Sequence, residues 1–254
     1  MLKTIVRKFL KAPVGGGGKK QDFRSVDAFY PVSETCQIPC LADIFKVFLG
    51  ERNNGVFVEV GAYDGEYASN TSCLADIGWN GLYIEPISSH YEKCVARHAN
   101  NKNIKVIHTG ISSTPGSQEM HSIGPLSTLD ESSYKNLGNM EWAQEYAQRK
   151  DTEIVSLACL EDILMQEGIS PDYDLLVVDV EGYEPEVFKS FSLENWMPKM
   201  IIVELHDVSV NYKKFHKPFR ELYLSILEIG YVAVYKDFSN TIFIKKTEYQ
   251  TNLE

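Results

Sequence analysis

The chain has 254 residues, of which 44% are hydrophobic and 24% charged, a composition typical of a globular protein with a substantial core. Its formal net charge of -10 argues against nucleic acid as the main partner, because a phosphate backbone would be repelled. Five scattered cysteines, with no second pair at zinc-site spacing, favour reduced thiols and a cytoplasmic location.

Residues 1–11 are predicted to form a basic amphipathic helix. Its apolar face consists of Leu2, Ile5, Val6, Phe9 and Leu10. Such a helix can lie on a membrane surface, which would make the protein peripheral to a membrane, but docking on the body or on a partner chain is the preferred interpretation. The glycines at 15–18 indicate a flexible linker. We therefore expect a helix and linker in residues 1–21 and one domain in residues 22–254.

A short amphipathic helix at 41–49 precedes a buried strand at 56–60, which ends in a turn between Gly61 and Gly65. Small polar residues at 69–71 then suit the N-terminus of a helix, with free N–H groups facing a ligand. Strand, glycine turn and helix together predict a cofactor loop of the nucleotide-binding type. The G-x-x-x-G spacing is neither the dinucleotide fingerprint nor the P-loop.

Carboxylates in and after this strand indicate the charge of the ligand. A diphosphate site avoids acids that point inward, whereas Glu59 and Asp64 suit the ammonium and sulfonium groups of S-adenosylmethionine. Glu85 ends the next strand, where an acid commonly binds ribose hydroxyls. The alternative is that these are ordinary acids at strand ends. The predicted cofactor-binding residues of this part of the chain are Glu59, Gly61, Ala62, Tyr63, Asp64, Ser69, Asn70, Thr71, Glu85 and Pro86.

A helix at 88–99 and a strand at 104–107 follow, and Gly110 and Ile111 are expected to flank the adenine. Residues 112–151 form a polar insertion with one helical patch at 141–148, predicted to be a lid or a substrate-selecting loop rather than a plain surface excursion. The insertion residues of most interest are Ser127, Thr128, Trp142 and Tyr146. A strand at 153–157 and a helix at 160–166 come next.

The continuous apolar run at 175–178 predicts a strand buried on both faces, which delivers Asp179 and Glu181 to the ligand crevice. Pro185 suits the first turn of the following helix. Another apolar run at 200–205 ends at His206 and Asp207. A helix at 218–229 and two strands at 231–235 and 241–245 complete the α/β pattern.

Taken together, the chain resembles the FkbM-type methyltransferase family between about residues 50 and 245. The matching stretches are residues 57–65, 69–71, 78–86, 179–184 and 203–206. The resemblance implies a Rossmann-like, seven-stranded, mostly parallel sheet whose last strand is antiparallel, with helices on both faces. It also implies S-adenosylmethionine as cofactor and methyl transfer to a hydroxyl of a sugar, glycan or natural product.

Catalytic candidates follow from the chemistry of methyl transfer. The acceptor oxygen, methyl carbon and sulfur must be in line, and a base must take the proton of a hydroxyl whose pKa lies far above neutral. His206 is the first candidate base and Asp179 the second, with Glu181 beside them. A divalent metal such as magnesium, held by Asp179, His206 and Asp207, is a variant that the spacing does not require.

Some alternative functions stay open, and two other enzyme classes are excluded because their sequence motifs are missing. The basic run Lys213, Lys214, His216, Lys217 and Arg220 suits either an anionic acceptor or a solvated loop. A non-catalytic binding or scaffold protein could keep the same fold. A nicotinamide-dependent oxidoreductase would need G-x-G-x-x-G after the first strand, and an α/β-hydrolase would need G-x-S-x-G, and the chain has neither. The sequence does not indicate the oligomeric state.

Overall fold

The computed structural model describes residues 29–208 and 216–252. The helix and linker predicted in residues 1–21, and Lys213 and Lys214 of the basic run, lie outside the described residues. Within the described ranges, no helix is both long enough and apolar enough to cross a bilayer.

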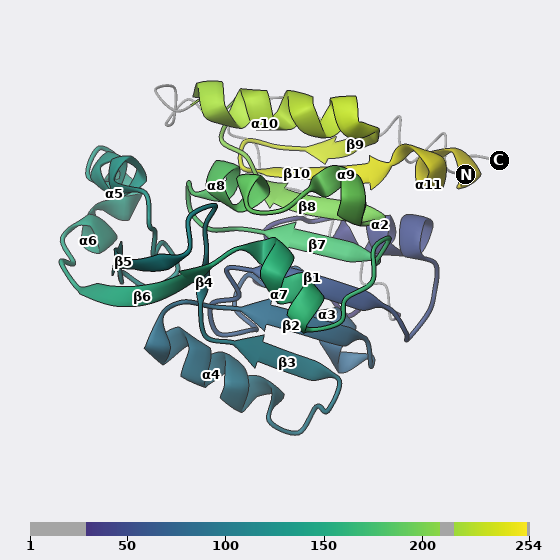
Figure 1. The fold of residues 1–254 in the computed structure, drawn as a ribbon, viewed down its shortest axis with the longest axis horizontal. Coiled ribbons are helices and arrows are strands. Elements are labelled where there is room, and N and C mark those ends of the chain that lie inside the picture. The colour runs from purple at the N-terminus through teal and green to yellow at the C-terminus, as the bar shows by residue number, and fades with distance from the viewer. Residues whose placement is uncertain (1–28, 209–215, 253–254) are drawn as a thin grey trace.

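The centre of the fold is a seven-stranded sheet with the order β3-β2-β1-β7-β8-β10-β9 (Figure 1). Its strands are β1 (Val56–Val60), β2 (Asn80–Ile84), β3 (Ile104–Ile107), β7 (Leu175–Val178), β8 (Met200–Glu204), β9 (Tyr231–Lys236) and β10 (Asn240–Lys245). The first five strands of the order are mutually parallel, and β10 runs antiparallel between β8 and β9. The predicted mostly parallel α/β sheet with an antiparallel last strand is confirmed.

Helices cover both faces of this sheet. On one face lie α2 (Leu41–Leu49), α3 (Ser72–Asp76), α4 (Ser88–His98) and α11 (Lys246–Thr251). On the other lie α7 (Leu160–Gln166), α8 (Glu184–Lys189), α9 (Leu193–Trp196) and α10 (His216–Ile229). Successive residues of a strand point to opposite faces, so Leu175 and Val177 join the first core and Leu176 and Val178 the second. The sequence of a strand that is buried on both faces is a continuous apolar run. Such a run made it possible to predict β7.

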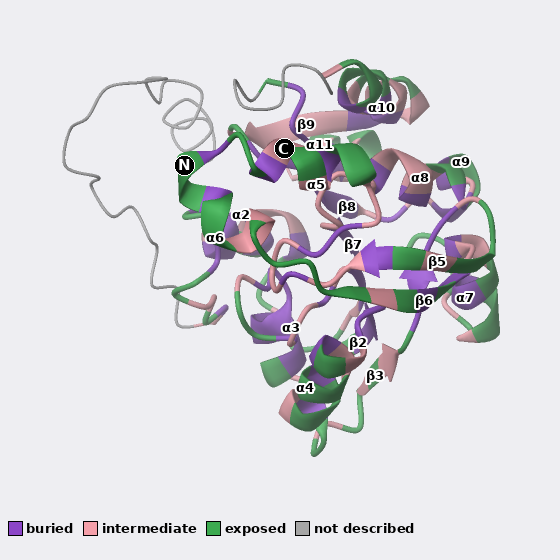
Figure 2. Cartoon of the chain, turned by 90° about the vertical axis from the view of Figure 1, so that its left-hand side faces the viewer, coloured by how far each residue is buried: buried purple, intermediate pink, exposed green. Residues whose placement is uncertain are grey.

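The insertion is more ordered than the sequence indicated. A second sheet has the order β4-β6-β5, from β4 (Gly110–Ile111), β5 (Gly116–His121) and β6 (Thr152–Ala158). Between β5 and β6 along the chain lie α5 (Glu131–Leu137), the 3₁₀ turn η1 (Glu141–Ala143) and α6 (Gln144–Ala147), around a small core of their own. The helical patch was predicted, whereas β5 and α5 were not. Strand β5 was missed because it has no continuous apolar run: β5 and β6 carry exposed stretches (Figure 2), whereas every residue of β7 and β8 is buried.

The turn after β1 touches the end of β7 closely. Gly61 has φ +87°, and its N–H donates to the carbonyl oxygen of Ile84 at 3.0 Å. A Cβ added to Gly61 would lie 1.8 Å from the backbone oxygen of Asp179. Glycine is therefore required here both for its conformation and for the contact between two strand ends.

Gly61→Ala should destabilise the fold much more than Gly50→Ala, which serves as its matched control. Both glycines have positive φ, but a Cβ on Gly50 meets nothing within 4 Å. We expect a loss in the free energy of unfolding of about 1 kcal/mol for Gly50→Ala and about 3 kcal/mol for Gly61→Ala, measured by urea denaturation. Equal losses would show that the close approach at Asp179 does not constrain the structure.

Candidate active site

A groove runs along the edge of the main sheet where β1, β2, β7 and β8 end. It consists of two adjoining cavities of about 450 Å³ and 50 Å³. Both are lined by Gly61, Tyr63, Pro125, Asp179 and Glu181. Because the carboxyl ends of parallel strands meet at one edge, ligands of open α/β sheets bind there.

The smaller cavity carries the residues predicted to bind the adenosine end of a cofactor. Glu85, Pro86, Gly110 and Ile111 all line it. The Oε2 of Glu85 accepts a hydrogen bond from the N–H of Tyr63 at 2.9 Å, and its Oε1 accepts one from the N–H of Ile87 at 2.9 Å. Each carboxylate oxygen keeps a lone pair after these bonds, so Glu85 can accept hydrogen bonds from two ribose hydroxyls.

Glu59 lies in the wall of the larger cavity, together with Ala62 and Ser69. Its carboxylate accepts hydrogen bonds from the hydroxyls of Thr71 and, at 3.3 Å, Ser69. Burial raises the pKa of Glu59 to about 7, although these hydrogen bonds act in the opposite direction. A cationic ligand group beside Glu59 would stabilise its charged form.

Three predicted cofactor residues line neither cavity. The Oδ1 of Asp64 accepts hydrogen bonds from the N–H groups of Glu66 and Tyr67, at 3.0 and 2.8 Å. Asn70 accepts a hydrogen bond from the thiol of Cys36, and Thr71 is fully buried. These side chains shape the loop between β1 and α3, and that they also bind the cofactor stays a prediction.

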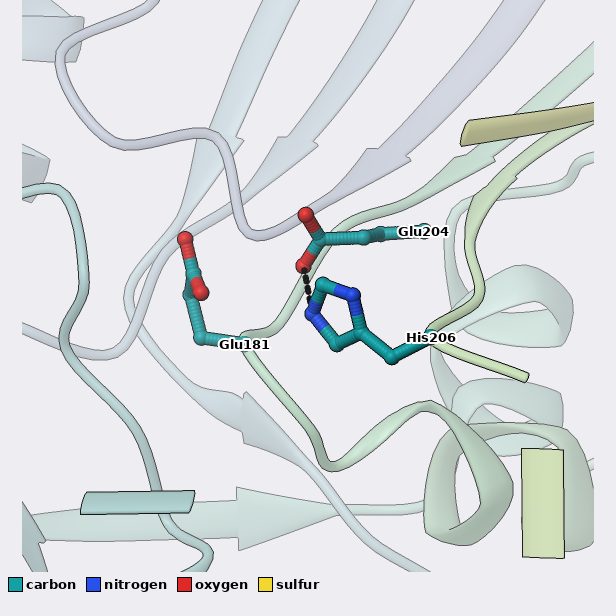
Figure 3. A group of neighbouring side chains, drawn as sticks. All are labelled: Glu181, Glu204 and His206. Carbon is teal, nitrogen blue, oxygen red and sulfur yellow. Dashed lines mark ion pairs between the residues drawn. The ribbon is translucent and has the colours of Figure 1, made fainter. Parts of the chain in front are cut away.

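The larger cavity has an acidic floor with one imidazole. Asp179, Glu181, Glu204 and His206 line it, and His206 Nε2 lies 3.3 Å from Glu204 Oε2 (Figure 3). The three predicted catalytic residues, His206, Asp179 and Glu181, are thus brought together. Glu204 was not predicted, although it ends β8 in the same way that Glu59 lies near the end of β1, and that pattern could have identified it.

The turn after β7 is held in an unusual conformation that points Glu181 into this cavity. Glu181 has φ +55°, a conformation that costs a non-glycine residue about 1 kcal/mol. The Glu184 carboxylate accepts hydrogen bonds from the N–H groups of Val180 and Gly182, at 3.0 and 3.1 Å. Thr128 of the insertion donates to the carbonyl oxygen of Glu181 at 2.8 Å. The surrounding residues therefore compensate the strain.

Burial and neighbouring charges shift the pKa values of the side chains on the floor of the larger cavity. Burial, and then the negative charges of neighbouring carboxylates, raise the pKa of Asp179 and that of Glu181 well above the ordinary range. Burial acts to lower the pKa of His206, but the Glu204 carboxylate outweighs it and the net shift is upward. The floor therefore attracts protons or other cations.

Aromatic side chains from three segments surround the mouth of the larger cavity. Tyr67, Trp142, Tyr146 and Phe238 line it, and Trp142 and Phe238 are 60% and 71% exposed. Ser127 lines the smaller cavity instead. The insertion thus contributes to both ends of the groove, where the lid or substrate-selecting loop was expected.

Asp207 does not join the predicted metal-binding group. It forms ion pairs with Lys236 at 2.5 Å and with Arg220 at 3.6 Å. Ligand atoms of Glu181, Glu204 and His206 instead lie within 4.8 Å of one another. The described part of the basic run lines neither cavity, so it gives the hypothesis of an anionic acceptor no support.

Comparisons with known proteins identify the family to which the chain is similar. The family model described as the methyltransferase FkbM domain matches residues 59–233. No curated protein sequence matches the chain. A solved O-methyltransferase from Bacillus cereus in complex with SAH is 13% identical, with a TM-score of 0.45, over 96% of this chain and 100% of that chain. A putative S-adenosyl-L-methionine-dependent methyltransferase from Methanococcus maripaludis is 11% identical, with a TM-score of 0.41, over 92% and 97% of the chains.

Glu59→Gln should change the pH dependence of stability. Below the ordinary carboxyl pKa of 4.5, Glu59 is protonated in both the folded and unfolded states and contributes nothing. As the pH rises from about 4.5 to about 7, the folded state keeps a proton that the unfolded state releases, so the wild type loses on the order of 3 kcal/mol. Glu59→Gln avoids this loss.

Urea denaturation of the ligand-free proteins at several pH values measures the effect. The difference in unfolding free energy, variant minus wild type, should grow steadily across that range. A difference that stays constant with pH would contradict the raised pKa of Glu59.

Proposed function

The chain belongs to the FkbM family of S-adenosylmethionine-dependent methyltransferases, and we propose that it methylates a hydroxyl group of a sugar, a glycan or a natural product. One observation carries the choice of a hydroxyl acceptor. The imidazole of His206 lines the larger cavity, paired with Glu204, in the same cavity that the aromatic side chains of the mouth line. A hydroxyl needs a base in this position, because it is a poor nucleophile while it keeps its proton.

The groove suits the donor along its length. Glu85 would accept hydrogen bonds from the ribose hydroxyls, with the adenine beside Gly110 and Ile111. Glu59 would meet the ammonium group of the methionine part, and Asp179 lies where the two cavities adjoin. When bound, S-adenosylmethionine supplies an electrophilic methyl group with a neutral thioether as the leaving group.

The acceptor would enter through the aromatic mouth. Trp142 and Phe238 offer flat apolar surfaces against which a sugar ring or an aromatic natural product can pack. His206 then accepts the hydroxyl proton as the oxygen approaches the methyl carbon. Glu204 orients the imidazole and stabilises its protonated form, as a carboxylate does beside a catalytic histidine. Asp179 is the second candidate for the base.

Transfer from donor labelled with ¹³C in its methyl group tests the proposal. The protein would be incubated with a library of hydroxylated sugars, glycans and natural products, and NMR would distinguish O-methyl from N-methyl products. We expect an O-methyl product, and His206→Asn should lower kcat by about 10²-fold to 10⁴-fold. An N-methyl product would overturn the hydroxyl acceptor. Tight donor binding without transfer to any acceptor would favour the alternative, a binding or scaffold protein with this fold.

Glu85→Gln should weaken cofactor binding, and Asp64→Asn is its matched control. Each change removes one negative charge without changing the size of the side chain, but only Glu85 lines the groove. Loss of charge-assisted hydrogen bonds should raise the Kd for S-adenosylhomocysteine about 10-fold to 100-fold in Glu85→Gln, measured by calorimetry. The Kd of Asp64→Asn should stay unchanged. A weaker affinity in Asp64→Asn than in Glu85→Gln would reverse the assignment of these two acids.

A further inference from the structure

The floor of the larger cavity brings three metal-binding side chains together from two neighbouring strand ends. Glu181 follows β7, while Glu204 ends β8 and His206 lies two residues later. One ligand atom of each lies within 4.8 Å of the others, and Figure 3 shows the two carboxylates and the imidazole converging. Glu204 is the last residue of β8, which pairs with β7, while Glu181 and His206 lie in the segments that directly follow these two strands. This anchoring close to the sheet favours a preformed site.

The two carboxylates of this group have few partners within the protein, apart from the contact between Glu204 and His206. Among the described residues, none donates a hydrogen bond to the carboxylate of Glu181. The Oε2 of Glu204 is buried, accepts no hydrogen bond and has its ion-pair contact with His206. The neighbouring acids differ, because Glu184 holds the turn after β7 and Asp207 pairs with Lys236.

The charges in the cavity do not balance. The described residues that line it include four carboxylates, those of Glu59, Asp179, Glu181 and Glu204, but no lysine or arginine. A bound donor brings two positive charges, its ammonium near Glu59 and its sulfonium near Asp179, and one negative charge, its own carboxylate. Of the remaining acids, Glu204 is buried beside His206 and Glu181 is half-buried. Together they carry one more negative charge than a protonated His206 can balance, and a bound cation would compensate it.

We propose that Glu181, Glu204 and His206 bind a divalent transition metal ion, of the Mn²⁺ or Zn²⁺ kind, that positions the acceptor hydroxyl. One imidazole with two carboxylates suits these ions better than Mg²⁺, which prefers oxygen ligands alone. Three protein ligands leave coordination positions open, as in catalytic metal sites, and the acceptor oxygen would occupy one of them. A bound metal would replace the role of His206 as the base, because His206 would then be a ligand. The hydroxyl proton would pass instead to Asp179, the second candidate base. The role toward the acceptor, but not the site itself, rests on the proposed function.

Binding of Mn²⁺ to chelator-treated, ligand-free protein tests the site. Calorimetry should show one Mn²⁺ per wild-type chain, and electron paramagnetic resonance should show the loss of free Mn²⁺. Glu181→Gln should weaken binding by at least about tenfold. Glu181 is partly exposed, so this variant is expected to fold, and its circular dichroism and thermal unfolding verify that. Glu85→Gln, at the far end of the groove, should bind Mn²⁺ as the wild type does.

Equal Mn²⁺ affinity in the wild type and Glu181→Gln would overturn the site, as would a wild type that binds S-adenosylhomocysteine but no Mn²⁺. The second result would leave the methyltransferase function intact. The converse result, Mn²⁺ binding that depends on Glu181 in a protein without affinity for S-adenosylhomocysteine, would support the site and contradict the proposed function. The two proposals therefore fail separately.

Discussion

Uncompensated negative charge at one edge of the sheet is the constraint on which the site depends. The two ends of β7 show it best. Asp174, just before the strand, accepts hydrogen bonds from Arg52 at 2.6 Å and Lys199 at 2.9 Å, and although burial opposes them, these partners lower its pKa. Asp179, just after the strand, has no such partners among the described residues, and burial raises its pKa. The first acid stabilises the fold, whereas the second costs stability and is ready for a cationic ligand.

Backbone geometry makes this arrangement possible. Gly61 lets the end of β1 approach Asp179, and the carboxylate of Glu184 holds the turn in which Glu181 adopts a positive φ. The insertion braces the same turn through Thr128 and supplies aromatic residues at the mouth. The insertion therefore contacts the turn that carries Glu181 and also lines the larger cavity, so a change in the insertion can alter the acidic floor.

The main sheet and the strand-end acids could be predicted because apolar runs reveal buried parallel strands, and parallel strands deliver their last residues to one edge. Asp64 could not be assigned, since an aspartate in a turn can bond its own backbone two residues on or face a ligand equally well. Strand β5 lacks an apolar period because it is mostly exposed. Glu204 ends a strand, as the other predicted acids do, and could have been identified by the same pattern. The catalytic role was instead assigned to His206, two residues later.

We propose that donor and acceptor meet over Asp179 and His206. A crystal structure with S-adenosylhomocysteine tests it most directly. We predict the ribose hydroxyls within hydrogen-bond distance of Glu85, the amino group beside Glu59, and the sulfur facing Asp179 and His206 across the larger cavity. A nucleoside bound away from Glu85, or a sulfur that points out of the larger cavity, would contradict the account.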